Sequence, residues 1–167
     1  SWRPRVTTAA RHARLMTSPS SWSADYRSKP MQRDFPRHLN SLAPLYEFSE
    51  AIMAGSDLPD GVRFPVHLAM EELFVNMVHY NPTVTTDIEV EVTVTTSPGV
   101  KVTVTLVDNG GMEFDVTAKR EVNIDAPLEE RTPGGLGIHL IQNLVDTLEY
   151  EYQDGRGEVI FTKGSGK

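Results

Sequence analysis

A carboxylate and a carboxamide lie four residues apart, at Glu72 and Asn76, in a stretch with helical spacing of apolar residues. Side chains at positions i and i+4 share one helix face, about 5–6 Å apart. A carboxylate beside an amide oxygen can hold a magnesium ion and orient a hydroxyl or a water for attack on a phosphate. The pair is equally compatible with a solvated helix face, so its meaning depends on the other motifs.

A second motif follows an apolar, alternating stretch that ends at Asp108-Asn109-Gly110-Gly111. An acidic side chain at a strand end can accept a hydrogen bond from an exocyclic amine, and a glycine such as Gly110 lets the backbone approach a ligand closely. The alternative is a plain Asp/Asn-Gly turn. Taken alone, the motif favours the turn.

A third motif, Gly134-Gly135-Leu136-Gly137, opens an amphipathic stretch that we expect to be helical to about Asp146. Backbone amides at a helix N-terminus, together with the helix dipole, attract phosphate oxygens. The alternative is a flexible glycine hinge. The sequence has neither the lysine-containing phosphate loop nor the dinucleotide-binding glycine spacing.

The pattern of apolar residues predicts the elements that must position these motifs. We expect an edge strand at 32–35, helices at 42–55 and 60–80, strands at 88–94 and 100–106, and final strands at 150–153 and 159–162. Leu140, Ile141, Leu144, Val145 and Leu148 fit one face of the helix that follows the third motif. Residues 111–134 lose periodicity, and a lid is expected there. The expected order is therefore a strand, two helices, two strands, the lid, a helix and two strands.

Composition limits the function further. The 167 residues suit one domain, and the absence of cysteine excludes thiol catalysis and disulfide frameworks. Residues 1–38 hold eight Lys/Arg and two Asp (8 − 2 = +6), whereas residues 39–167 hold eight Lys/Arg and twenty-one Asp/Glu (8 − 21 = −13). We expect a basic, disordered extension over 1–30 and an acidic domain over 31–167, and we assign the basic excess to the extension. Such a domain does not favour nucleic acid as a partner, and no apolar stretch is long enough for a membrane span.

In this order and spacing, the three motifs resemble the N box and the two glycine boxes of the GHKL ATPase superfamily. The chain looks most like the anti-sigma factor serine kinases and their histidine-kinase-like ATPase relatives. The segment 126–131 also looks like the short lid of that subgroup. The resemblance extends from about Met31 to Lys163.

The resemblance implies an α/β (α+β) fold, a Bergerat-type two-layer sandwich with a mixed, mostly antiparallel sheet covered by helices on one face and an ATP lid. It implies ATP and Mg²⁺ as cofactors, with Asn76 as the metal ligand and Glu72 as the general base. Asp108 would receive the adenine amine, and Gly110 would let the base approach. The phosphates would lie against the backbone of Gly134, Gly135, Leu136 and Gly137.

The resemblance also implies a function. We expect a cytoplasmic kinase that phosphorylates Ser/Thr on an anti-anti-sigma (STAS) partner and regulates a sigma factor by partner switching. One alternative is a nucleotide-dependent binding module without turnover. Another is the ATPase domain of a two-component sensor kinase, and a further one is an α+β domain whose glycine motifs are only structural. The sequence leaves a homodimer open and identifies no individual partner.

Overall fold

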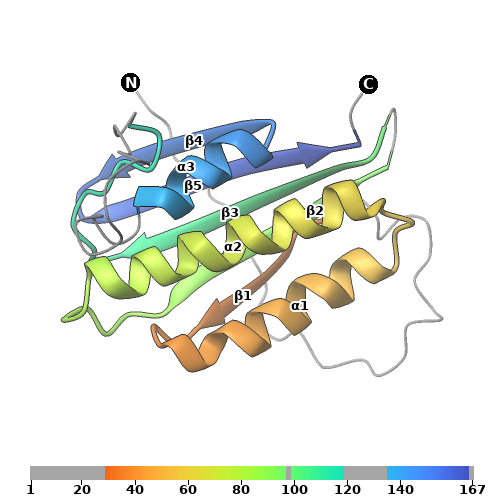
Figure 1. Cartoon of the computed structure of the whole chain (residues 1–167). Helices are drawn as coiled ribbons and strands as arrows, with labels where there is room; N and C mark the ends of the chain where they lie inside the picture. The colour runs from red at the N-terminus through yellow and green to blue at the C-terminus, as the bar shows by residue number, and fades with distance from the viewer. Residues whose placement is uncertain (1–28, 97–98, 119–134, 166–167) are drawn as a thin grey trace, which may run out of the picture.

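The computed structural model describes residues 29–96, 99–118 and 135–165 (Figure 1). The strands in these ranges are β1 (Met31–Phe35), β2 (Ile88–Thr95), β3 (Lys101–Asn109), β4 (Thr147–Gln153) and β5 (Arg156–Gly164). The helices are α1 (Leu42–Ala54), α2 (Asp60–Tyr80) and α3 (Gly135–Leu144), with a short 3-10 helix at Leu39–Ser41 before α1. The expected order of elements is confirmed.

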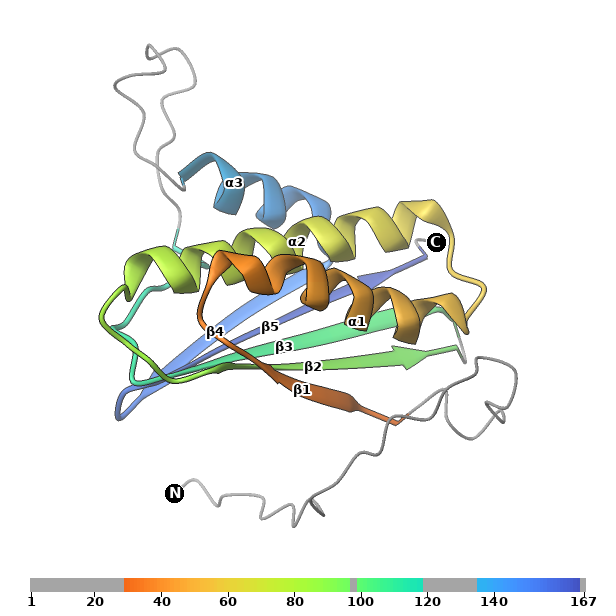
Figure 2. The ribbon, with the colours of Figure 1, turned by 90° about the horizontal axis from the view of Figure 1, so that it is seen from below.

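The five strands form one sheet in the order β1-β2-β3-β5-β4, and all four pairings are antiparallel. The three helices lie side by side on one face of this sheet, with α2 between α1 and α3 (Figure 2). This arrangement confirms the two-layer α/β (α+β) sandwich, and the described strands form a fully antiparallel sheet rather than the mixed one expected. The other face of the sheet carries no helix of the described chain.

Alternation of apolar and polar residues explains the two central strands. In β2 the valines at 90, 92 and 94 and Ile88 are buried, while the glutamates and threonines between them are only partly covered. Because successive side chains of a strand point to opposite faces, one face of β2 meets the helices. The β4–β5 connection is Asp154-Gly155, and both residues have positive φ (52° and 80°), as a two-residue hairpin turn of type I′ requires.

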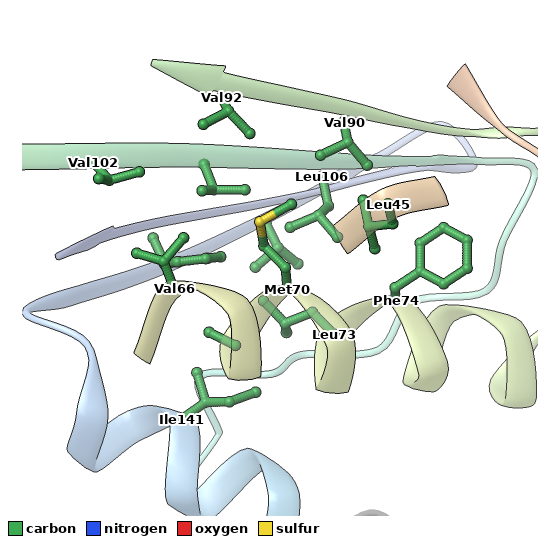
Figure 3. Packing of buried hydrophobic residues seen from close by; sticks show 14 of the residues in the cluster. Leu45, Val66, Met70, Leu73, Phe74, Val90, Val92, Val102, Leu106 and Ile141 are labelled. Atoms are coloured by element: carbon green, nitrogen blue, oxygen red, sulfur yellow. The ribbon is translucent and has the colours of Figure 1, made fainter. Parts of the chain in front are cut away.

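The core lies between α2 and the sheet (Figure 3). Val66, Met70, Leu73 and Phe74 recur at helical spacing on α2, and none is more than 1% exposed. They pack in one cluster with the buried side chains of β2, β3 and β5. Ile141 of α3 belongs to the same cluster and reaches it from the side of α2 that faces α3. Burial of each such side chain stabilises the fold by about 1.5–3 kcal/mol. This packing fixes α2, which carries Glu72 and Asn76.

Two expectations for the third helix were wrong. Leu148 lies in β4 rather than on the helix, because Leu148, Tyr150 and Tyr152 alternate with polar residues and pair with β5. Leu140 was expected on the buried face but is 42% exposed. Ile138 and Ile141, three residues apart, form that face instead, with exposures of 2% and 0%.

Some expectations fall on residues outside the described ranges. These are the basic extension up to residue 28 and most of the expected lid, including 126–131. Among the residues that the structure describes, no helix is both long enough and apolar enough to cross a membrane.

Candidate functional site

The chain brings Glu72 and the start of α3 together. Glu72 is half-buried, and a Cβ built on Gly137 would fall 2.9 Å from its Cδ atom. With Glu72 in this side-chain position, a glycine at 137 lets the first turn of α3 approach the carboxylate this closely. The neighbouring Glu71 is exposed and lines a different hollow, between α1 and α2. The four-residue spacing to Asn76 therefore selects the acidic residue that faces α3.

Asn76 lies one helical turn after Glu72 and is 4% exposed. Its Nδ2 atom is buried, and it has no hydrogen-bond partner among the described residues. The oxygen and nitrogen of a carboxamide are assigned from the surrounding hydrogen bonds, so the observation concerns the amide group as a whole. A buried amide without a partner costs about 1–3 kcal/mol, and a ligand at this position would remove that cost.

These residues fit a magnesium site of the kind that nucleotides complete. Within the described ranges, no cluster of three or more His, Cys, Asp or Glu side chains could hold a metal by itself. Magnesium is commonly held by one or two protein oxygens plus phosphate oxygens and water. The amide oxygen of Asn76 and the carboxylate of Glu72, which lie one helical turn apart on α2, would supply that small protein share.

Asp108, next to the C-terminal residue of β3, is held in a buried polar network. Its Oδ2 accepts hydrogen bonds from Asn81 Nδ2 at 3.0 Å and from Arg37 Nη1 at 3.3 Å, and its Oδ1 is ion-paired with Arg37 Nη2. The side chains of Arg37 and Asp108 are only 3% and 8% exposed. Asn81 also accepts the backbone N–H of Met112 at 2.8 Å, which ties the following loop to this network.

The two glycines after β3 have different reasons to be glycine. Gly110 has φ of +83°, in the left-handed region that other residues rarely adopt, and its N–H donates to the Gly155 carbonyl at 2.7 Å. Gly111 lies against the polar network. A Cβ built on it would fall 2.5 Å from Asp108 Oδ2 and 2.8 Å from Asn81 Nδ2. Gly110 therefore allows the turn, and Gly111 allows the backbone to lie close to Asp108.

A small cavity connects Asn76 with Asp108. Its lining comes from α2, from the ends of β3 to β5 and from the loop after β3. Tyr80 and Phe114 stack over this region with ring centroids 3.9 Å apart. The cavity holds about 20 Å³, whereas pockets for drug-sized ligands usually have about 300–1,000 Å³. In this conformation the site is filled by protein side chains, so a purine base would have to displace some of them.

Tyrosines of β4 anchor the loop that closes this cavity. Tyr150 accepts the backbone N–H of Phe114 at 2.9 Å, and the Tyr152 hydroxyl donates to the Gly111 carbonyl at 3.2 Å. Burial raises the pKa of the Tyr150 hydroxyl above 10.0, against the lowering effect of the Phe114 N–H. The hydroxyl is therefore neutral at physiological pH. Gly111 and Phe114 are thus each held by a hydrogen bond to a strand.

The structure brings most of the predicted site residues to one end of α2. Glu72 faces Gly137, Asn76 and Asp108 line one cavity, and Gly110 forms the turn beside it. Gly135 and Leu136 lie in the first turn of α3, while Gly134 is outside the described residues.

Sequence reasoning missed three residues of this site. Gly111 could have been found as the second glycine of its motif, because two successive glycines after a strand exceed what a simple turn needs. Arg37 and Asn81 gave no local signal. Arg37 was counted with the basic excess of residues 1–38, and assigning that whole excess to the extension was wrong for this buried side chain.

The sandwich, the glycine-rich end of β3 and the glycine start of α3 define a histidine-kinase-like nucleotide-binding fold. The family model of the histidine kinase-like ATPase domain matches residues 35–163. The chain therefore belongs to the histidine kinase-like ATPase domain family, within the GHKL superfamily.

A solved structure supports the fold independently. The crystal structure of the RsbU and RsbW domains of Rv1364c from Mycobacterium tuberculosis matches with a TM-score of 0.58 at 12% identity. The match covers 81% of this chain and 32% of that one, so this chain spans about a third of the length of its structural relative. No curated protein matches the sequence.

Proposed function

We propose that this protein is an ATP-dependent serine/threonine kinase of the anti-sigma factor type. In this proposal it phosphorylates an anti-anti-sigma (STAS) partner and thereby regulates a sigma factor. The main support is the Glu72–Asn76 pair, which lies one turn apart on α2, with the carboxylate against the start of α3 and the amide buried beside the Asp108 cavity. The sequence resemblance to anti-sigma factor kinases and the RsbW-containing structural relative point in the same direction.

Each side chain has a role in this proposal. Asn76 binds Mg²⁺, which when present neutralises phosphate charge, and Asp108 accepts the amine of adenine. Glu72 takes the proton from the attacking serine or threonine hydroxyl of the partner. Backbone amides in the first turn of α3 bind phosphate oxygens, because that end of a helix carries unpaired N–H groups and partial positive charge.

Phosphotransfer from radiolabelled ATP tests the proposal. We expect Mg²⁺-dependent labelling of a purified STAS protein that carries an acceptor serine, and a loss of about 100-fold or more in the Glu72→Gln variant, as expected for removal of a general base. Glu71→Gln is the matched control, because it removes the adjacent but exposed carboxylate. Undiminished transfer in Glu72→Gln would contradict the assigned base.

Calorimetric measurement of ATP binding, combined with the phosphotransfer assay, distinguishes the kinase from the alternative functions. ATP binding without transfer to any STAS partner would favour a nucleotide-dependent binding module. ATP-dependent labelling of a histidine kinase's phosphoacceptor segment would favour a sensor-kinase ATPase domain. If the wild-type chain did not bind Mg²⁺–ATP, the kinase, the nucleotide-dependent binding module and the sensor-kinase ATPase domain would all be contradicted.

A further inference from the structure

Arg37 is a buried cation whose position is fixed by backbone groups. It lies in the connection between β1 and the 3-10 helix, with a side chain that is 3% exposed. Its Nη1 donates to the Met77 carbonyl at 2.8 Å, and its Nε donates to the Thr86 carbonyl at 3.2 Å. Met77 is in the last turn of α2, where carbonyls lack helical partners and a cation is favoured. These contacts anchor the guanidinium independently of Asp108.

The same guanidinium occupies most of the hydrogen-bonding capacity of Asp108. An ionised carboxylate has about four lone-pair sites. Arg37 takes one site on each oxygen, and Asn81 takes a second site on Oδ2. Counted over the part of the chain that the structure describes, one acceptor site remains, on Oδ1. Asp108 is also part of the lining of the cavity next to Asn76. The carboxylate is held in one orientation by contacts from two separate segments of the chain.

We propose that Arg37 is a positioning residue for base selection. It holds the Asp108 carboxylate so that its remaining acceptor site receives the exocyclic amine of a 6-aminopurine nucleotide. This inference rests on the proposed nucleotide site. A fixed, ionised carboxylate can only accept hydrogen bonds, so it favours a 6-amino group and disfavours a 6-oxo group. Without Arg37, Asn81 alone among the described residues would orient the carboxylate, and none of them would place a cation beside its buried charge.

A purely structural role for Arg37 makes a different prediction. The side chain joins the end of α2, the segment before β2 and the end of β3, so its loss could loosen the whole site. Loosening would weaken binding of every nucleotide that uses the site. Loss of positioning would weaken only the nucleotides that carry the 6-amino group. Two ligands that differ in this group therefore distinguish the two roles.

The experiment measures Kd by calorimetry, with Mg²⁺, for ATP and for purine riboside 5′-triphosphate, which lacks the 6-amino group. For the wild type we expect ATP to bind about tenfold more tightly. In Arg37→Met this ratio should fall to within twofold, while the Kd for purine riboside triphosphate changes by less than threefold. In Arg37→Lys, which keeps the charge without the paired geometry, the ratio should be about threefold. Arg63→Met is the control, because it removes an ion pair with Glu50 between α1 and α2 and should keep the wild-type ratio.

The outcomes separate this inference from the proposed function. Wild-type chain that fails to bind ATP would overturn both. Wild-type chain that binds both nucleotides equally would overturn base selection and leave the nucleotide site standing. A parallel loss of both affinities in Arg37→Met, or an unchanged ratio in Arg37→Lys, would show that Arg37 only supports the fold. The ratio compares two ligands on one preparation, so an unfolded fraction cancels, and Arg37→Lys serves if Arg37→Met does not fold.

Discussion

Gly111 lies directly against the carboxylate of Asp108, because a Cβ on Gly111 would fall 2.5 Å from Oδ2. Asp108 cannot move away easily, since Arg37 and Asn81 hold it. A glycine at this position is therefore a requirement of the buried polar network rather than of the turn alone.

The first prediction concerns this contact. Gly111→Ala should lower the free energy of unfolding by about 1–3 kcal/mol, as overpacking in a filled site usually does, and should weaken ATP binding. Urea denaturation and calorimetry measure the two effects. Gly61→Ala is the matched control, because a Cβ there meets nothing within 4 Å and the residue lies inside α2. It should raise stability by about 0.5–1 kcal/mol. Equal effects at the two glycines would contradict the packing argument.

The sequence predicted this fold well where one periodicity dominated. Alternation of apolar and polar residues over 88–94 and 100–106 predicted two strands, which the structure confirms as β2 and β3. The prediction failed at Leu148, where a helical spacing from α3 continued by chance into a strand. There the pairing with β5 decides the structure, and pairing between distant segments leaves no trace in local spacing.

The candidate site shows the same limit. The spacing of Glu72 and Asn76 and the glycines at 110 and 137 are local features, so the sequence could predict them. Arg37 is 71 positions before its partner Asp108. Its side chain is buried because the end of α2, the segment before β2 and the end of β3 converge on it. A single sequence carries no signal for such convergence. The net charge of residues 1–38 could not indicate that Arg37 is buried, because a buried arginine contributes the same charge as an exposed one.

The second prediction concerns Glu72 and Gly137. In the wild-type background, Gly137→Ala should destabilise the chain slightly, because the added Cβ would overlap the Glu72 carboxylate and the flexible end of that side chain would have to turn away from α3. In a Glu72→Ala background the obstacle is gone, and the same change should be neutral or stabilising by up to about 1 kcal/mol, the usual gain for alanine over glycine in a helix. A double-mutant cycle of unfolding free energies measures the coupling. Additive effects would contradict the prediction, because they would mean that Glu72 turns away from residue 137 without a cost in stability.

The third prediction concerns pH. Burial is the largest cause that raises the pKa of Glu89 above 4.5, followed by the nearby Asp34, with Arg156 opposing and Glu91 and Glu158 adding to the rise. The folded chain therefore binds more protons at this carboxyl than the unfolded chain. Its contribution to the free energy of unfolding should fall as the pH rises from about 4.5 through the raised pKa.

Glu89→Gln removes this contribution. The variant should gain stability relative to wild type as the pH rises above about 4.5, and its loss of stability with rising pH should be shallower. Urea denaturation at several pH values between 4.5 and 7 measures it. Glu71→Gln, which removes an exposed carboxylate on α2, is the control and should parallel the wild type. A Glu89→Gln profile that also parallels the wild type would contradict the prediction.

The fourth prediction concerns Asn81, which connects Asp108 to the loop after β3. Asn81→Ala leaves the Met112 N–H without its acceptor and removes one of the hydrogen bonds to Asp108 Oδ2. Because the residue is 4% exposed, the variant should lose about 1–3 kcal/mol of stability.

Asn143→Ala is the matched control for Asn81→Ala. Asn143 is exposed and, among the described residues, its side chain bonds to His139 within α3, so its loss should stay within about 0.5 kcal/mol. Hydrogen exchange at Met112 distinguishes the mechanism from general loosening. Asn81→Ala should speed exchange of that amide more than exchange of the β3 core amides, because the first loses its acceptor and the others keep theirs. Uniform acceleration would show that Asn81 supports the whole fold instead of holding this loop to the site.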